Sequence, residues 1–261
     1  MPADDTRLRV GSDSEEEQSS ASETTPAVNL KAALAEFMAS TMFVIIGCGT
    51  ACNYGAGTPT TKLIVAFAFG MGILTLAYAI SHLSGGQING AVTWSLVIGG
   101  ELTLLQGVVN VLAQLSGSVL AALILTQVVS CDNDITKNLG SNVVNPKYGD
   151  LHALIGEAIG TFLLTMVVFE TAVNPASGSG PNTCLAIGFA VFLAHLLLLP
   201  IDGCSINPTR SFGPAVVSKL RGCPNYGEGG LRDLWIFWVG PLLGGSLAAV
   251  TRTIFKIKKS G

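Results

Sequence analysis

Charged residues are scarce in this sequence: Asp, Glu, Lys and Arg together make up 12% of its 261 residues. Ordinary soluble domains contain about 25%. Most of these charges lie outside the apolar runs, and 49% of the residues are hydrophobic. A soluble bundle of buried helices would need polar outer faces, and the run LIVAFAFGMGILTLAYAI (63–80) offers none. The shortage of charge therefore excludes an ordinary soluble domain and indicates a membrane protein.

Patterns of catalytic and metal-binding residues are also missing. No apolar run contains a nucleophile beside a base, so an enzyme is not expected and no cofactor is predicted. Cys48 and Cys52 are four residues apart on one helix face, but no histidine accompanies them, so they are a weak pattern for a metal. We expect the six cysteines to be free thiols. A bridge between Cys131 and Cys223 stays open, since both can lie in loops on one face.

Six apolar runs have about the 20 residues that a helix needs to cross the hydrocarbon core of a bilayer. The first run follows a long acidic tail and is too long for a signal peptide. Small residues four apart, such as Gly156 with Gly160 and Gly240 with Gly244, are typical of closely packed membrane helices. The sequence predicts transmembrane helices at about 31–52, 62–80, 103–127, 151–173, 183–201 and 232–255.

Two shorter apolar segments, 89–98 and 207–217, follow the related sequences GGQIN and GCSIN. Segments of about ten residues are too short to span a bilayer and suggest re-entrant elements. Irregular backbone at membrane depth is tolerated only where it is buried in protein or lines water. Two such segments in corresponding places therefore point to a site between them.

The chain contains an internal repeat. AEFMAST (35–41) resembles GEAIGTF (156–162), which aligns Glu36 with Glu157, and Asn89 aligns with Asn207. Each half has three spans and one short segment, and an odd number of spans inverts the second half. We therefore predict an all-α membrane protein with six transmembrane helices and two re-entrant half-helices in an inverted repeat. Its parts are a disordered acidic tail (1–28), a first repeat (29–127), a connecting loop (128–150), a second repeat (151–255) and a basic tail (256–261).

The paired asparagines have a physical role in this arrangement. Asparagine is a preferred N-cap and proline the favoured residue after it, so Asn207-Pro208 predicts the start of a short helix. The amide group also carries two N–H donors that can face a lumen. Two half-helices meeting N-terminus to N-terminus direct two positive dipole ends at one point, where a cation is repelled. At the equivalent Gly90, proline would fix the backbone, so Gly90→Pro is expected to stabilise by about 0.4–1 kcal/mol.

These motifs resemble those of the aquaporins, the major intrinsic protein family. GGQINGAVT resembles the first family signature, S-G-x-H-x-N-P-A-V-T, and INPTRSFGPAV resembles the second, N-P-A-R-S-F-G-P-A. The resemblance covers about residues 30–255, with Gln87, Gly90 and Thr209 in place of the usual His, Pro and Ala. A literal Asn-Pro-Ala at 174–176 is followed only by Gly, Ser and Pro, which predicts a loop. The implied central half-helix motifs are Asn89, Gly90 and Ala91 with Asn207, Pro208 and Thr209.

The resemblance also implies a selectivity constriction formed by Phe69, His195, Cys204 and Arg210. An arginine within an apolar stretch suggests a functional role in its own right. Glycerol-conducting members typically have a small residue in place of the histidine and an aspartate after the arginine, whereas Ser211 follows Arg210 here. The set therefore resembles that of water-selective members. A mercurial bound to Cys204 is expected to block the path.

The implied function is a passive water channel that excludes protons and ions. The alternatives are a channel for glycerol or another small neutral solute and, third, a secondary transporter with inverted repeats. Glu36 and Glu157 could relay protons, but their symmetry favours a supporting role, in which each accepts hydrogen bonds from the backbone near its half-helix. Water and the lipid bilayer are the expected partners, with a homotetramer as the assembly and no nucleic acid.

The resemblance also suggests where the protein lies. It implies an integral protein of the plasma membrane or of an internal vesicle or vacuole membrane, with both termini in the cytoplasm. Lysine and arginine are spread almost equally over the two sides, so the positive-inside rule decides little. The orientation therefore depends on the resemblance and on the basic C-terminal sequence RTIFKIKK.

Overall fold

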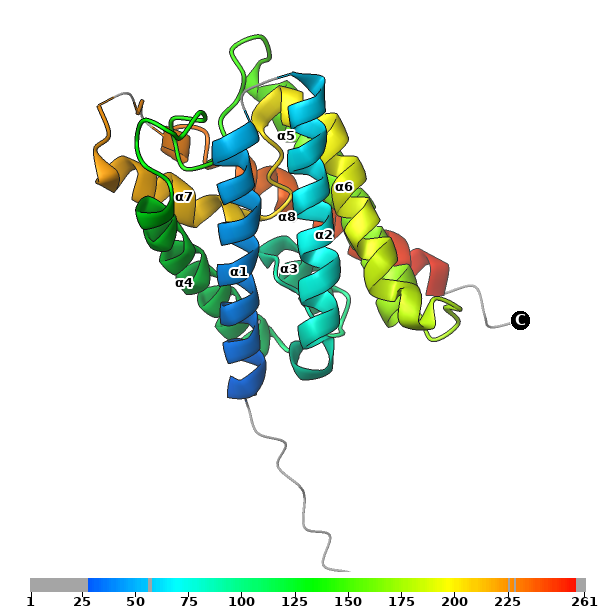
Figure 1. Cartoon of the computed structure of the whole chain (residues 1–261). Coiled ribbons are helices and arrows are strands. Elements are labelled where there is room, and N and C mark those ends of the chain that lie inside the picture. The colour runs from blue at the N-terminus through cyan, green and yellow to red at the C-terminus, as the bar shows by residue number, and fades with distance from the viewer. Residues whose placement is uncertain (1–27, 56–57, 225, 228, 257–261) are drawn as a thin grey trace, which may run out of the picture.

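The structure, a computed structural model, describes residues 28–55, 58–224, 226–227 and 229–256. The predicted acidic tail, apart from Val28, and the predicted basic tail, apart from Lys256, lie outside the described residues. Within the described ranges every regular element is a helix (Figure 1). The α-helices are α1 (Leu30–Tyr54), α2 (Pro59–Ser84), α3 (Gly90–Ile98), α4 (Leu104–Val128), α5 (Asp150–Val168), α6 (Thr183–Asp202), α7 (Pro208–Arg221) and α8 (Ile236–Lys256).

Three short segments complete the helical structure. A π-helical turn (Phe169–Val173) continues α5, and 3₁₀ turns at Gly180–Asn182 and Gly229–Leu231 precede α6 and α8. Five helical stretches of the described chain are long and apolar enough to cross a membrane: Leu30–Tyr54, Pro59–Ser84, Leu104–Val128, Asp150–Val173 and Gly180–Asp202. The sixth predicted span is α8, which has 21 residues and contains Arg252 near its end. With α3 and α7 as the two half-helices, the predicted fold class is confirmed.

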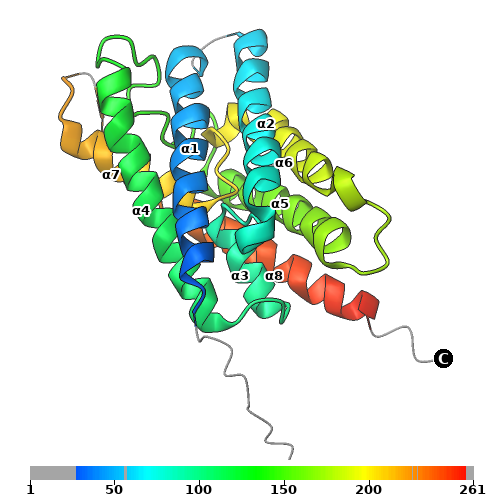
Figure 2. The ribbon, with the colours of Figure 1, turned by 60° about the horizontal axis from the view of Figure 1, so that its bottom comes forward.

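The packing of the helices follows the inverted repeat (Figure 2). In the first half α1 packs against α2 and α4, and in the second half α5 packs against α6 and α8. Contacts between α2 and α6 join the two halves. The half-helices cross over, because α3 lies mainly on α8 and α7 lies mainly on α4. This exchange brings the two N-termini of the half-helices into the interior.

Glycines allow the long helices to approach closely. A Cβ atom on Gly244 of α8 would lie 2.1 Å from the carbonyl oxygen of Ala158 on α5, and one on Gly156 would lie 2.6 Å from a methyl group of Leu198. Real Cβ atoms do not approach other atoms so closely. The predicted small-residue pairs therefore do lie at helix interfaces.

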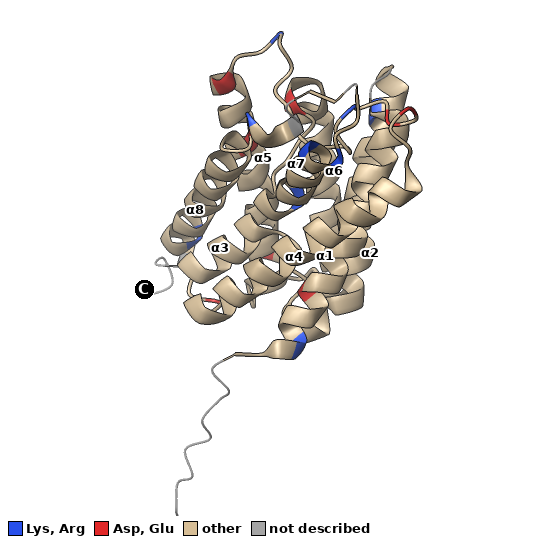
Figure 3. Cartoon of the chain, turned by 90° about the vertical axis from the view of Figure 1, so that its left-hand side faces the viewer, with Lys and Arg blue, Asp and Glu red and all other residues tan. Residues whose placement is uncertain are grey.

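The charged residues lie mostly at the helix ends, whereas the sides of the helices are largely uncharged (Figure 3). Many large apolar side chains point outward from these sides, among them Leu34 and Met38 on α1 and Leu243 and Leu247 on α8. An apolar perimeter with charges at its two ends matches the cross-section of a bilayer.

The loops give one confirmation and one correction. The literal Asn174-Pro175-Ala176 lies in a turn after the π-helical segment, where the Asn174 side chain accepts a hydrogen bond from the Ala176 amide (3.0 Å), so the predicted loop is confirmed. Cys131 and Cys223 form a disulfide with an S–S distance of 2.01 Å. The expectation of six free thiols was wrong for this pair, because the segments after α4 and α7 meet on one face. Cys48, Cys52, Cys184 and Cys204 are free and buried.

Candidate functional site

The half-helices α3 and α7 each begin at an asparagine. The side-chain oxygen of Asn89 accepts hydrogen bonds from the backbone N–H groups of Ala91 (2.8 Å) and Val92 (3.4 Å). The side-chain oxygen of Asn207 accepts from the backbone N–H of Arg210 (3.2 Å). Both residues have extended backbone, as an N-cap requires. The caps predicted from the sequence are thus present on both half-helices.

The amide groups of the two asparagines join the half-helices to each other. The Asn89 amide donates to the carbonyl of Ile206 (2.8 Å), and the Asn207 amide donates to the carbonyl of Ile88 (2.9 Å). An asparagine amide carries two N–H groups. Among the described residues each amide therefore keeps one donor without a protein partner, at the point where the two positive helix ends meet.

The turn before each half-helix is strained and is held by a buried glutamate. Ile88 and Ile206 have φ angles of 53° and 45°, which β-branched residues rarely adopt. Glu36 accepts from the N–H groups of Gln87 (2.9 Å) and Ile88 (2.6 Å). Glu157 accepts in the same way from Ser205 (2.7 Å) and Ile206 (2.6 Å). The two carboxylates thus hold equivalent turns in the two repeats.

Gly90 and Thr209 face each other across the junction of the half-helices. The Gly90 N–H donates to the Thr209 hydroxyl (3.2 Å) and to the Asn207 side-chain oxygen (3.4 Å). A Cβ atom on Gly90 would lie 2.9 Å from the Thr209 methyl group. Proline has no N–H and would crowd this methyl group. These contacts favour the opposite of the expected stabilisation by Gly90→Pro, because the partner across the junction is Thr209.

Buried amide side chains along α4 support the first half-helix, and sequence reasoning missed them. Gln106, Asn110 and Gln114 are spaced by four residues and face inward. Asn110 donates to the side-chain oxygen of Gln87 (3.2 Å), and Gln114 donates to Glu36 (2.8 Å). The spacing of polar residues in LLQGVVNVLAQLSG was the signal that could have revealed them.

The structure brings Phe69, His195 and Arg210 together. The rings of Phe69 and His195 are stacked with their centroids 4.5 Å apart, and the Arg210 guanidinium lies 4.7 Å from the centre of the Phe69 ring. Gly47 makes room for Phe69, since a Cβ atom there would lie 2.2 Å from the ring. Cys204, three residues before Asn207, is also fully buried. Phe69 thus contacts both His195 and Arg210, which brings three of the four predicted constriction residues together.

The hydrogen bonds of His195 and Arg210 leave a buried acceptor and a buried donor unused. The His195 Nδ1 atom lies 2.8 Å from the Val191 carbonyl oxygen, which can only accept, so Nδ1 carries the proton and Nε2 is an acceptor. His195 Nε2 and Arg210 Nε are buried and have no partner among the described residues. Buried polar atoms are normally hydrogen-bonded. A small molecule would satisfy these atoms by donating to His195 Nε2 or by accepting from Arg210 Nε.

Arg210 is held by a loop that sequence reasoning did not connect with it. Its Nη1 atom donates to the carbonyl of Gly140 (3.1 Å) and to the side-chain oxygen of Asn142 (2.6 Å). Ser211 also donates to Asn142 (2.7 Å). No local signal identifies these contacts, because Gly140 and Asn142 are about seventy residues earlier in the chain.

Two cavities lead toward Asn89. One of about 320 Å³ is lined by Gln87, Glu101 and Leu102, and the next, of about 30 Å³, is lined by Gln87 and Asn89. Gly85, Leu96, Val168 and Ala172 line both, so the cavities adjoin. Together they form a path from the α3–α4 loop to Asn89 at the start of α3.

Two inverted repeats, whose half-helices meet at paired asparagines beside these cavities, define a membrane channel. Residues 23–251 match the family described as major intrinsic protein, and the chain belongs to this family. It is 39% identical over 221 residues to Aquaporin-5 of Homo sapiens, covering 85% of this chain and 79% of that protein. It is 36% identical over 228 residues to Aquaporin-1 of Sus scrofa, covering 84% and 80% respectively.

A solved structure supports the fold. The aquaglyceroporin from Plasmodium falciparum superposes with a TM-score of 0.73 at 19% sequence identity, covering 88% of this chain and 96% of that one. At this identity the likeness concerns the fold alone. The identification as an aquaporin-family membrane channel depends on the family match and the relatives.

Proposed function

We propose that the protein is a passive water channel that excludes protons and ions. The observation that carries the proposal is the contact of Phe69 with both His195 and Arg210, in a buried cluster where His195 Nε2 and Arg210 Nε have no partner among the described residues. Water donates and accepts, and it is small enough for such a site. The names of the relatives, Aquaporin-5 and Aquaporin-1, agree with this choice. The proposal requires no cofactor and no catalysis.

Proton exclusion follows from the centre of the path. The half-helix N-termini give a positive potential that raises the energy of a proton there. The free N–H groups of Asn89 and Asn207 both donate to the central water, so its oxygen is occupied and it cannot pass a proton along the file. Glu36 and Glu157 act in this proposal as supports, since their oxygens already accept from the turns that precede the asparagines.

The test is stopped-flow swelling of proteoliposomes in osmotic and glycerol gradients. The purified protein should raise water permeability and leave glycerol permeability near that of empty liposomes. The double variant Phe69→Ala with His195→Gly should admit glycerol, because both rings are removed from the cluster. A wild-type channel that passes glycerol freely would favour the solute-channel alternative. Saturation and dependence on an ion gradient would favour a transporter.

Cys204 supplies a separate test of the path. We propose that it lies at the constriction, so that a mercurial on its sulfur blocks water flow and an added thiol restores it. Cys204→Ser should conduct water without being inhibited. The variant Cys184→Ser is the matched control, since Cys184 is also a free, buried cysteine. Inhibition that persists in Cys204→Ser would assign the mercurial site to another cysteine.

We further propose that both termini face the cytoplasm and that the channel is a homotetramer of the plasma membrane or an internal membrane. The disulfide supports the orientation, because disulfides persist on the oxidising side of a membrane. The disulfide joins the segments after α4 and α7. In the loop after α4, the backbone N–H of Ile135 donates to the carbonyl of Cys52 near the end of α1. The disulfide therefore lies on the side of the membrane opposite the start of α1. Epitope tags at the termini test the orientation and should bind antibody only after permeabilisation. Light scattering of the detergent-solubilised protein tests the tetramer.

A further inference from the structure

The connecting loop between α4 and α5 is fastened to the segment after α7 by a cluster that the proposed conduction mechanism does not use. The cluster consists of the Cys131–Cys223 disulfide, Asp134, Thr136 and Tyr226. Asp134 is fully buried, although it lies in a loop. A buried carboxylate is costly unless its hydrogen bonds are satisfied, so its partners define its role.

Asp134 fixes the part of the loop that reaches Arg210. One carboxylate oxygen accepts from the N–H (2.9 Å) and the hydroxyl (2.5 Å) of Thr136. The other accepts from the N–H of Leu139 (2.7 Å) and from the Tyr226 hydroxyl. The Thr136 hydroxyl in turn accepts from the N–H of Gly140 (2.9 Å). Asp134 thereby holds two successive N–H groups, that of Leu139 directly and that of Gly140 through Thr136.

The backbone between these contacts has an unusual conformation. Lys137, Leu139 and Gly140 have φ angles of 59°, 56° and 66°. Such angles cost energy for residues other than glycine and persist only where the surroundings impose them. A Cβ atom on Gly140 would lie 2.8 Å from the carbonyl oxygen of Cys48, so the turn is also pressed against α1. This backbone conformation points the Gly140 carbonyl oxygen at the Arg210 guanidinium.

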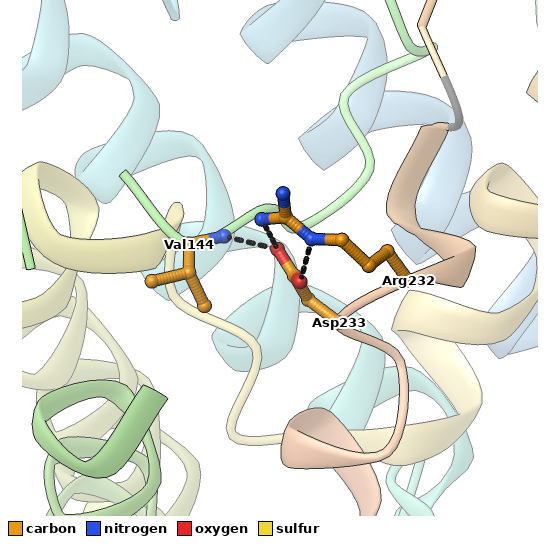
Figure 4. A network of polar contacts seen from close by, with 3 residues as sticks. All are labelled: Val144, Arg232 and Asp233. Atoms are coloured by element: carbon orange, nitrogen blue, oxygen red, sulfur yellow. Dashed lines mark hydrogen bonds and ion pairs between the residues drawn. The ribbon is translucent and has the colours of Figure 1, made fainter. Parts of the chain in front are cut away.

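The other end of the loop is fastened independently. The N–H of Val144 donates to Asp233 (2.8 Å), whose carboxylate also pairs with Arg232 (Figure 4). The backbone N–H of Asn145 donates to the carbonyl of Ile201 (2.8 Å). Gly140 and Asn142, which hold Arg210, lie between the two fastened ends. Among the described residues they supply all the hydrogen bonds of the guanidinium.

We propose that Asp134 and the Cys131–Cys223 disulfide are positioning residues for Arg210, which they hold in the constriction through the Gly140 carbonyl. Both ends of α7 are tied to this part of the structure. Arg210 lies in its first turn, while Arg221, at its last residue, donates to the carbonyls of Thr126 (2.9 Å) and Val129 (2.6 Å) at the end of α4. Just after Arg221, Cys223 is joined by the disulfide to Cys131 at the start of the loop. This inference rests on the proposed water-channel function.

The experiment measures the ratio of glycerol to water permeability per channel in proteoliposomes. The variants are Asp134→Asn, Tyr226→Phe, and Cys131→Ser combined with Cys223→Ser. Each should raise the ratio severalfold, toward the value of Arg210→Val, because the guanidinium loses its fixed position. The matched controls are Asp132→Asn, an exposed aspartate of the same loop, and Cys184→Ser, and both should keep the wild-type ratio.

The permeability ratio is a readout that a loss of folded protein would not move, because it is taken per channel. Folding is checked by thermal melting. If Asp134→Asn or the cysteine variant does not fold, Tyr226→Phe decides the question, since it removes one oxygen atom and leaves the ring. Wild-type ratios in the folded variants, with a raised ratio in Arg210→Val, would overturn the inference and leave the proposed function standing. A wild-type protein without water permeability would overturn the proposed function instead.

Discussion

At the residue scale, the chemistry of the site depends on a few polar atoms that the protein leaves unpaired. His195 Nε2 and Arg210 Nε are buried without a partner among the described residues, and Asn89 and Asn207 each keep one N–H. These atoms are buried, where an unsatisfied polar group costs about 1–3 kcal/mol. They persist because each side chain is fixed by its other hydrogen bonds. Their arrangement is what a passing water molecule would meet.

The contact between Gly90 and Thr209 gives a prediction at this scale. Gly90→Pro should lower the melting temperature in detergent, by the equivalent of about 1–3 kcal/mol, since it deletes a buried donor and crowds the Thr209 methyl group. Thr209→Ala removes both the methyl and the hydroxyl group. Combined with Gly90→Pro it should recover much of the loss, with a coupling of about 0.5–3 kcal/mol.

Thermal melting of the wild type, both single variants and the double variant gives the complete cycle. A higher melting temperature for Gly90→Pro alone would mean that the junction adapts to proline without help from residue 209. Additive effects of the two substitutions would show that Gly90 and Thr209 do not interact.

At the scale of the elements, the half-helices depend on the long helices that receive them. α3 lies on α8 and α7 lies on α4, so each repeat supports the short helix of the other. The strained turns before the half-helices are held from α1 and α5 by Glu36 and Glu157. Because Glu157 is on α5, the packing of α5 against α8 also affects the position of the second turn.

Gly244 tests this approach. Gly244→Ala should lower the melting temperature by the equivalent of about 1–3 kcal/mol, because its Cβ atom would overlap the Ala158 carbonyl oxygen. Alanine is the better helix former by about 1 kcal/mol, so a loss of stability can be attributed to packing. Leu247→Ala, on the exposed side of the same helix, is the control and should change little. Equal melting temperatures for Gly244→Ala and the wild type would show that the two helices can separate freely.

At the scale of the whole molecule, Asp134 joins segments that are distant in the chain. Its loop contacts α1 through Ile135 and Cys52, and its carboxylate receives the hydroxyl of Tyr226, which follows α7. Burial raises the pKa of this carboxyl, but the hydrogen bonds from Thr136, Tyr226 and Leu139 outweigh burial and hold the pKa below its usual range. The charged form is therefore the one that the fold stabilises.

This pKa shift predicts how stability depends on pH. A depressed pKa adds stability above the unfolded-state value of about 3.9, and this contribution is lost as the pH falls through the lower folded-state pKa. The wild type should therefore exceed Asp134→Asn in melting temperature at about pH 7, and the difference should shrink below about pH 4. Melting curves of both proteins in detergent, with Asp132→Asn as control, measure this. A difference that does not change with pH would assign the role of Asp134 to packing instead of charge.

Much of the fold could be read from the sequence because the bilayer imposes strong local rules. A helix must have about 20 apolar residues to span the membrane, and short segments beside such helices must be re-entrant. These rules placed the spans, the half-helices and the inverted repeat. The caps at Asn89 and Asn207 could also be predicted, since N-capping depends on a residue and its next few neighbours. The end of α7 could not be predicted, since this helix runs to Arg221 and the segment was expected to end at 217.

The sequence by itself therefore determined the fold class, the paired motifs and the family, all of which depend on composition and short spacing. The tertiary structure decided which distant residues meet. It set Thr209 against Gly90, joined Cys131 to Cys223, and brought Gly140 and Asn142 to Arg210. Each of these pairs is separated by about seventy residues or more, and no local periodicity encodes such a contact. The physical reason is that these contacts arise only when the two repeats pack against each other.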